Sequence, residues 1–189
     1  MKKLTLCIVI LTMLQTAVYS QDYKLGAKAG INFANLTGDF QNGKTRTSIH
    51  LGGVAEFRIN DLFAVQPELL YSGQGANADN DDNNVVKINY ITIPVIAKYF
   101  VTESLTIEAG PQVGFLASAK STVDGNTTDI KEFTKSMDLG FNLGLGYVLD
   151  QGVFFGARYY FGSDINDAPN STMKIKNGVF QLSAGYYFK

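Results

Sequence analysis

Apolar residues alternate with polar or small residues along most of the chain after position 21. From Tyr23 to Phe33 every second residue is apolar, and Lys24, Gly26 and Lys28 stand among the residues between them. A period of two is typical of a β-strand with two different faces, whereas a helix has a period near 3.6. The alternation returns seven more times, so the pattern predicts eight strands, at residues 23–33, 49–59, 63–71, 91–99, 105–115, 139–147, 153–161 and 180–188.

The connections between these strands alternate in length. Short turns are predicted at residues 60–61, 102–104 and 150–152. The other connections are longer, at about residues 37–46, 73–85, 119–134 and 163–176. Because long and short connections alternate strictly, we predict an antiparallel up-and-down meander with a short-turn end and a long-loop end. The strands use the whole chain after residue 20, so a single domain is expected.

Eight alternating strands fit two opposite barrels. In a soluble lipocalin-like barrel the apolar face points inward, and in an outer-membrane barrel it points outward to lipid. The second face decides between them, because it carries eleven of the 19 glycines. Glycine weakens a solvent-exposed strand but suits the cramped interior of an eight-stranded barrel. The 43 positions of the apolar face hold no charged residue, and we therefore predict an all-β, eight-stranded transmembrane barrel.

Aromatic residues support the lipid-facing assignment. Fifteen of the 23 lie on the apolar face, many of them near strand ends, as Tyr71, Tyr99, Tyr147 and Phe161 do. Aromatic girdles at the two interfaces anchor barrels in membranes. A soluble core rich in phenylalanine is the alternative interpretation of the same residues.

The second face carries charges of both signs in nearly equal number. Buried charges are tolerated only when they are paired and hydrogen-bonded, so the interior should hold an ion-paired network that blocks the lumen. We place its centre at Lys98 and assign to it Glu56, Arg58, Glu68, Lys98, Glu108, Asp138 and Arg158. General acid–base catalysis by these carboxylates is the alternative, but no nucleophile with a base accompanies them.

Composition narrows the classes of function. Lys plus Arg number 16 and Asp plus Glu 17, for a formal net charge of -1, which argues against a nucleic-acid partner. One Cys and one His exclude a disulfide scaffold and a His-cluster metal centre. We expect no catalytic residue, cofactor or metal ligand, and no enzyme activity. An enzyme would have to use His50, predicted on the inner face near the first long loop.

The first twenty residues have the pattern of an export signal. Lys2 and Lys3 precede an apolar stretch, Leu4 to Leu14, which is too short to span a bilayer. Val18 and Ser20 are at the positions expected before a cleavage site. We predict a signal peptide at residues 1–20 and a mature barrel at residues 21–189.

Five segments resemble strands of the small outer-membrane β-barrel family known as porin-family or PorT-like proteins. They occur in the order of that family and are residues 66–72 (QPELLYS), 90–99 (YITIPVIAKY), 109–114 (AGPQVG), 138–146 (DLGFNLGLG) and 158–159 (RY). The resemblance implies an eight-stranded barrel in a Gram-negative-type outer membrane. It implies no single activity, because the family includes secretion-linked proteins.

Three functions are compatible with this sequence. The first is a structural or interaction barrel with a plugged polar lumen and four long extracellular loops, associated with the envelope or with secretion. The second is a narrow porin for small solutes, which the filled interior of eight strands disfavours. The third is an outer-membrane enzyme. The expected partners are outer-membrane lipid, the barrel-insertion machinery, and envelope or secretion proteins.

Overall fold

The computed structural model describes residues 23–39, 43–78, 84–169 and 171–188, and the predicted signal peptide at residues 1–20 lies outside them. Eight long strands form the wall, and a short strand extends one of its hairpins. The elements are β1 (Tyr23–Gly38), β2 (Gly43–Arg58), β3 (Phe63–Ala78), β4 (Val85–Phe100), β5 (Leu105–Val123), β6 (Asn126–Asp129), the 3-10 helix η2 (Lys131–Phe133), β7 (Met137–Val148), β8 (Val153–Asp164) and β9 (Ile175–Tyr187).

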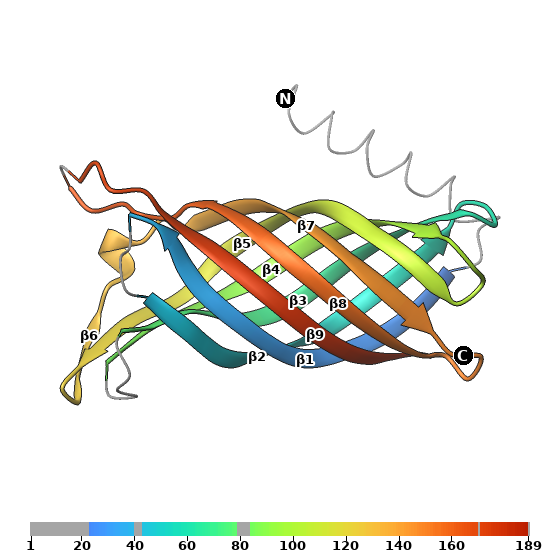
Figure 1. Ribbon diagram of the computed structural model, residues 1–189, viewed down its shortest axis with the longest axis horizontal. Coiled ribbons are helices and arrows are strands. Elements are labelled where there is room, and N and C mark those ends of the chain that lie inside the picture. The colour runs from blue at the N-terminus through green and yellow to red at the C-terminus, as the bar shows by residue number, and fades with distance from the viewer. Residues whose placement is uncertain (1–22, 40–42, 79–83, 170, 189) are drawn as a thin grey trace, which may run out of the picture.

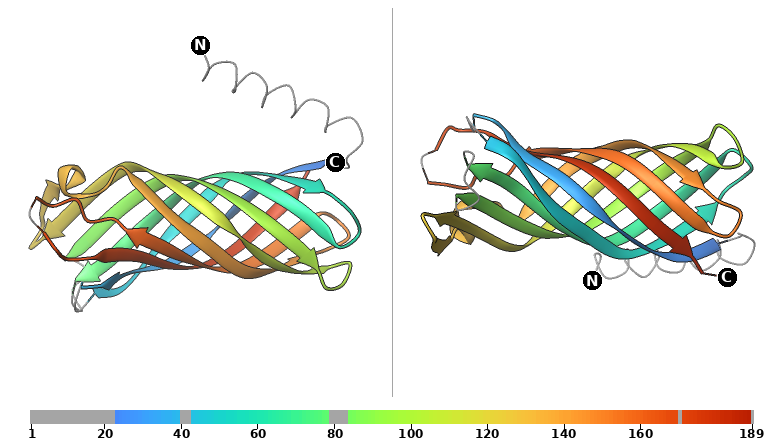
Figure 2. Two further views of the ribbon diagram at one scale, coloured as in Figure 1. Left: turned by 90° about the horizontal axis from the view of Figure 1, so that it is seen from above. Right: turned by 60° about the horizontal axis from the view of Figure 1, so that its bottom comes forward.

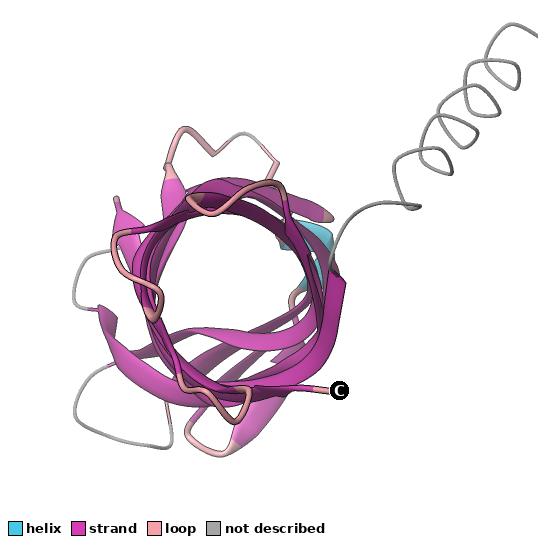
Figure 3. Ribbon diagram, turned by 90° about the vertical axis from the view of Figure 1, so that its right-hand side faces the viewer, coloured by secondary structure: helices cyan, strands magenta, loops and turns pink. Residues whose placement is uncertain are grey.

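The wall closes on itself, which confirms the predicted fold class. Neighbouring strands are antiparallel and follow the order β4-β3-β2-β1-β9-β8-β7-β5, and β4 also pairs with β5. The first and last strands meet in one ladder, in which Gly30 lies opposite Ser183. The view along the axis shows the resulting ring (Figure 3). Closure removes every free edge from these strands, as a barrel in lipid requires.

The two ends of the barrel differ as the connection lengths predicted. The tight turns after β2, β4 and β7 lie at one end, and β6, η2 and the β8–β9 connection lie at the other (Figures 1 and 2). At this second end the predicted strand limits are wrong, because the strands run further. β3 continues to Ala78 and β5 to Val123, and β2 begins at Gly43. There the polarity of the two faces is reversed, with Ala76 and Ile88 buried and Lys87 exposed. The pattern of apolar residues on the outer face therefore ends before the backbone pairing does.

Three prolines stand inside the wall, in adjacent strands: Pro67 in β3, Pro94 in β4 and Pro111 in β5. From the sequence, such prolines would be expected at bulges or strand ends near the rim, because proline lacks the N–H of the ladder, but none of the three lies at either. Pairing is interrupted beside each proline, and it resumes in the same register on both sides. For example, Val54 opposite Glu68 and Phe57 opposite Val65 keep one register across the gap at Pro67. The wall therefore accepts each missing N–H as a local gap in the ladder.

Burial in this barrel is the reverse of that in a soluble protein. Large apolar side chains on the outside are half exposed, as are Leu69 at 58%, Leu143 at 51% and Phe161 at 54%. The polar neighbour Asn142 points inward and is 1% exposed. Aromatic side chains contact one another near the strand ends, as Phe63 and Tyr99 do with ring centroids 5.2 Å apart. The outer surface thus has the character of a lipid-facing wall.

Among the described residues, no helix has the length and apolar character needed to cross a membrane.

Leu143→Arg should destabilise the barrel by about 2–4 kcal/mol, because it places a charge on the lipid face at mid-strand. The adjacent Asn142→Ser keeps a polar group in the lumen and should cost far less. Urea unfolding of both variants in lipid vesicles measures the difference. A mild effect at Leu143 together with a severe one at Asn142 would contradict the outward assignment of the apolar face.

Candidate functional site

Six buried charged side chains form one chain of ion pairs across the interior. Lys28 Nζ lies 2.8 Å from Glu68 Oε2, and Glu68 Oε1 lies 2.8 Å from an Arg158 terminal nitrogen. Arg158 Nε lies 2.6 Å from Glu108 Oε2. Lys98 Nζ continues the chain at 3.8 Å from Glu108 Oε1. The chain ends at Glu56, whose Oε2 lies 2.6 Å from the same Lys98 Nζ.

The order of strands makes this chain span the barrel. β3 and β8 lie four strands apart in both directions around the ring, so the pair of Glu68 and Arg158 crosses its full width. The other close pairs join strands two steps apart, such as β1 with β3 through Lys28. Positive and negative charges alternate along the chain, three of each. All six side chains are nearly inaccessible to solvent, so each charge depends on its neighbours for compensation.

Neutral side chains complete the hydrogen bonding around Lys98. Its Nζ donates to Gln66 Oε1 at 3.2 Å and to the Tyr187 hydroxyl at 3.1 Å. Gln66 Nε2 donates to Glu68 Oε1 at 2.7 Å, which ties the two parts of the chain together. The Tyr187 hydroxyl lies within hydrogen-bond distance of both Gln66 Oε1 and Glu56 Oε2. The charged centre is therefore held by several strands at once.

The structure brings together five of the seven residues assigned to the network and leaves two outside. Arg58 lies at the short-turn end, where its side chain donates to the carbonyls of Asn60 and Asp61 and stacks 3.6 Å from the Phe100 ring centroid. Asp138 lies toward the long-loop end and accepts from Asn177 Nδ2 at 2.8 Å. In their place Lys28 joins the chain. Its inward position followed from the alternation, but its partner depended on which strands face each other after closure.

A layer of amides and hydroxyls lies next to the charged centre. His50 Nδ1 is 2.7 Å from Asn32 Oδ1, and Nε2 is 2.9 Å from Ser183 Oγ. Asn32 Nδ2 donates to Ser72 Oγ, so its Oδ1 is the acceptor, and the neutral His50 ring then carries its hydrogen on Nδ1. The prediction that His50 lies near the first long loop is wrong. It is completely buried in the middle of a strand, because β2 begins at Gly43.

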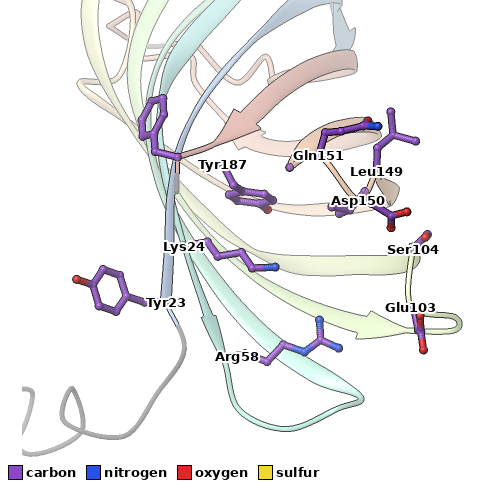
Figure 4. Close-up of a pocket in the computed structure, with 12 residues that line it drawn as sticks. Tyr23, Lys24, Arg58, Glu103, Ser104, Leu149, Asp150, Gln151 and Tyr187 are labelled. Atoms are coloured by element: carbon purple, nitrogen blue, oxygen red, sulfur yellow. The ribbon is translucent and has the colours of Figure 1, made fainter.

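The short-turn end opens into a cavity of about 570 Å³. Lys24 and Arg58 face it from one side, and Glu103 and Asp150 from the turns on the other (Figure 4). Tyr187 closes it toward the interior, where it packs on Phe154 with ring centroids 4.5 Å apart. The mouth is thus separated from the charged centre by an aromatic layer.

The long-loop end of the interior is apolar. Leu36, Ala76, Ile88, Tyr90, Ala119 and Ile165 form a buried cluster there. These residues belong to the parts of the strands that run past the predicted limits, and Ile165 follows β8 directly. The cluster gives the extended hairpins a small core of their own.

Comparisons with known proteins agree with this architecture. Residues 19–165 match the family model described as outer membrane protein beta-barrel domain, which confirms the resemblance in the sequence motifs. Neisserial surface protein A has a similar structure, with a TM-score of 0.58 and 18% identity over 87% of this chain and 97% of that protein. No curated protein matches the chain in sequence.

Ail, the attachment invasion locus protein of Yersinia pestis, is also similar. Its structure in complex with the heparin analogue sucrose octasulfate has a TM-score of 0.55 and 16% identity, over 88% of this chain and 99% of Ail. At these identities the likeness shows the fold alone.

Glu68→Gln should lower the free energy of unfolding by about 3–5 kcal/mol, because it leaves Lys28 and Arg158 short of one buried negative charge. Glu103→Gln at the solvent-exposed mouth is the matched control and should change stability by less than about 0.5 kcal/mol. Adding Lys28→Met to Glu68→Gln restores two charges of each sign and should recover part of the loss. Denaturant titration measures all three, and equal losses at Glu68 and Glu103 would contradict the network.

Proposed function

Because the chain belongs to the outer membrane protein β-barrel family, we propose that it is a closed, non-conducting barrel of the Gram-negative outer membrane that acts through its loop end. The observation that carries this proposal is the pair of Glu68 and Arg158, which joins opposite walls of the ring. Ions entering the lumen would have to separate this buried pair, which would leave Glu68 with Lys28 alone and Arg158 with Glu108 alone. The interior side chains then hold the wall rigid, and binding takes place at the ends of the barrel.

The long-loop end is the better candidate for an interaction surface. Its strands continue as hairpins beyond the apolar belt, the band of apolar side chains on the outside of the wall. β6 and η2 add ordered structure there. The apolar cluster around Ile88 and Ile165 supports these hairpins from within. We propose that this end faces the cell exterior as four long loops, which bind envelope or secretion-linked proteins. The barrel-insertion machinery would recognise the chain during assembly.

A narrow porin is the second candidate, supported by the cavity of about 570 Å³ at the short-turn mouth. For a solute to pass, the aromatic layer at Tyr187 and the charged centre would both have to open. The porin alternative therefore requires a second arrangement of these residues.

We also propose that the protein is not an enzyme. Hydrogen bonds link Ser183 to His50 and His50 to Asn32, in the order of the nucleophile, base and orienting residue of a hydrolase. The His50 ring is completely buried, however, and Asn32 is fully engaged by Ser72, Gly73 and Gln181. These contacts support a role in joining β1, β2 and β9.

Wild-type protein in planar lipid bilayers should show no steady conductance. The double variant Arg158→Ala/Glu68→Ala removes the crossing pair and leaves two charges of each sign in the chain of ion pairs, so it should produce open-channel events. Lys24→Ala/Glu103→Ala, a balanced pair at the mouth, should remain closed. Large stable channels in the wild type would overturn the plug and favour the porin.

An epitope inserted after Gly125 should be accessible to antibody on intact cells. Gly125 has a φ of 79° in the β5–β6 turn, and a side chain there would meet no other atom within 4 Å, so the insertion should not disturb the wall. An epitope after Gln151, in the β7–β8 turn, should react only after the cells are lysed. The reverse result would mean that the barrel is inserted with the opposite orientation.

A further inference from the structure

Asp138 is a buried carboxylate that has hydrogen-bond donors but no ion-pair partner in the part of the chain that the structure describes. It lies near the start of β7 and is 1% exposed. Its Oδ2 accepts from Asn177 Nδ2 at 2.8 Å, and its Oδ1 accepts from the Ser163 backbone N–H at 3.1 Å and from Ser163 Oγ at 3.4 Å. These donors are all neutral, so they solvate the negative charge without cancelling it.

Among the described residues, the other inward cations are engaged elsewhere. Arg46 donates to the Gln74 backbone carbonyl, and Lys24 and Arg58 lie at the opposite, short-turn end. In the chain of ion pairs, Lys28, Lys98 and Arg158 balance three glutamates. None of the ion pairs among the described residues includes Asp138. A charge buried in a protein is ordinarily paired or coordinates a metal ion. The buried charge of the Asp138 carboxylate is therefore not offset by an ion pair.

Several oxygen atoms around Asp138 also lack a partner. The Oδ1 atoms of Asn142 and Asn177 and the hydroxyls of Tyr90 and Tyr160 are buried without a hydrogen bond. All four residues are at most 2% exposed. Unsatisfied buried polar atoms are rare in folded proteins and call for an explanation, such as a missing water molecule or ion.

The positions of these oxygens relate them to the carboxylate. The side-chain nitrogen of Asn177 donates a hydrogen bond to Asp138, so Oδ1 of the same amide lies close to the carboxylate. The Tyr160 hydroxyl is close enough to the Asp138 carboxylate to interact with it directly, and the Tyr90 hydroxyl lies near both Asp138 and Asn177. In the β7–β8 ladder Asn142 lies directly opposite Tyr160. One carboxylate and several neutral oxygens thus gather in a single layer of the lumen.

We propose that this layer binds a hard monovalent cation, such as Na⁺ or K⁺, with Asp138 as its charged ligand and Asn177, Tyr90 and Tyr160 as neutral ligands. Oxygen is the donor that hard cations prefer. A monovalent ion would neutralise the Asp138 carboxylate, whereas a divalent ion would leave an excess positive charge beside it. Water molecules could satisfy the free oxygens, but they would leave the charge of Asp138 in place. The site goes beyond the proposed plug and lies in a separate layer.

The test compares thermal unfolding of the folded barrel in detergent at pH 8, in NaCl, KCl and choline chloride of equal ionic strength. A ligand that binds only the folded state raises stability as its concentration increases. The melting temperature should therefore rise with NaCl or KCl and saturate, while choline, which is too large for the site, should have little effect. Asp138→Asn should abolish the difference between the salts, and in choline it should be no less stable than the wild type.

Asp164→Asn is the matched control, because Asp164 is a partly exposed carboxylate at the same end, 2.7 Å from Lys135. This variant should keep the response to Na⁺ or K⁺. Tyr160→Phe removes one neutral oxygen and should raise the salt concentration at half-saturation several-fold, which tests the site even if Asp138→Asn does not fold. The proposal is overturned if all three salts act alike on the wild type, or if Asp138→Asn keeps the response.

Discussion

In the hydrocarbon of a membrane, every polar group must find its partner inside the protein. The backbone of this chain meets that condition by closure, since β1 pairs with β9 and no barrel strand keeps a free edge. The side chains meet it by separation into an uncharged outer face and a polar inner face. Once the charges of the second face are enclosed, they can be compensated only by one another. The alternation of Lys28, Glu68 and Arg158 across the interior is the direct result.

The interior is consequently organised in layers along the axis. At the short-turn end, the aromatic rings of Phe154 and Tyr187 separate the open mouth from the charges. The ion pairs follow, and the amides and hydroxyls around His50 lie next to them. Beyond the apolar belt, where Ile88 and Ile165 are buried, the barrel resembles a small soluble protein with an ordinary core. With this division, one part of the sheet suits the lipid of the membrane and the other part suits water.

The sequence predicted the wall well, because the orientation of a side chain in a strand depends only on its own position in the alternation. It predicted the strand ends poorly, since beyond Tyr71 and Phe115 the apolar side chains, such as Ala76 and Ala119, are buried inside and the outer face no longer shows the apolar pattern. The partners inside the lumen depend on the height of each residue after the strands tilt and close. For that reason the sequence wrongly suggested Arg58 and Asp138 as members of the charged centre and did not suggest Lys28.

Because Arg158 comes from β8, the charged centre has a defined order of completion. An incomplete sheet of β1 to β5 contains two of its lysines and all three of its glutamates, so one carboxylate is in excess. Only when the C-terminal strands join the sheet does Arg158 reach both Glu68 and Glu108. The charges of the centre are therefore balanced only when β8 is in place, one strand before β9 closes the seam with β1. A chain truncated before β8 would keep one glutamate without its partner, so the charged centre favours the complete barrel over any shorter sheet.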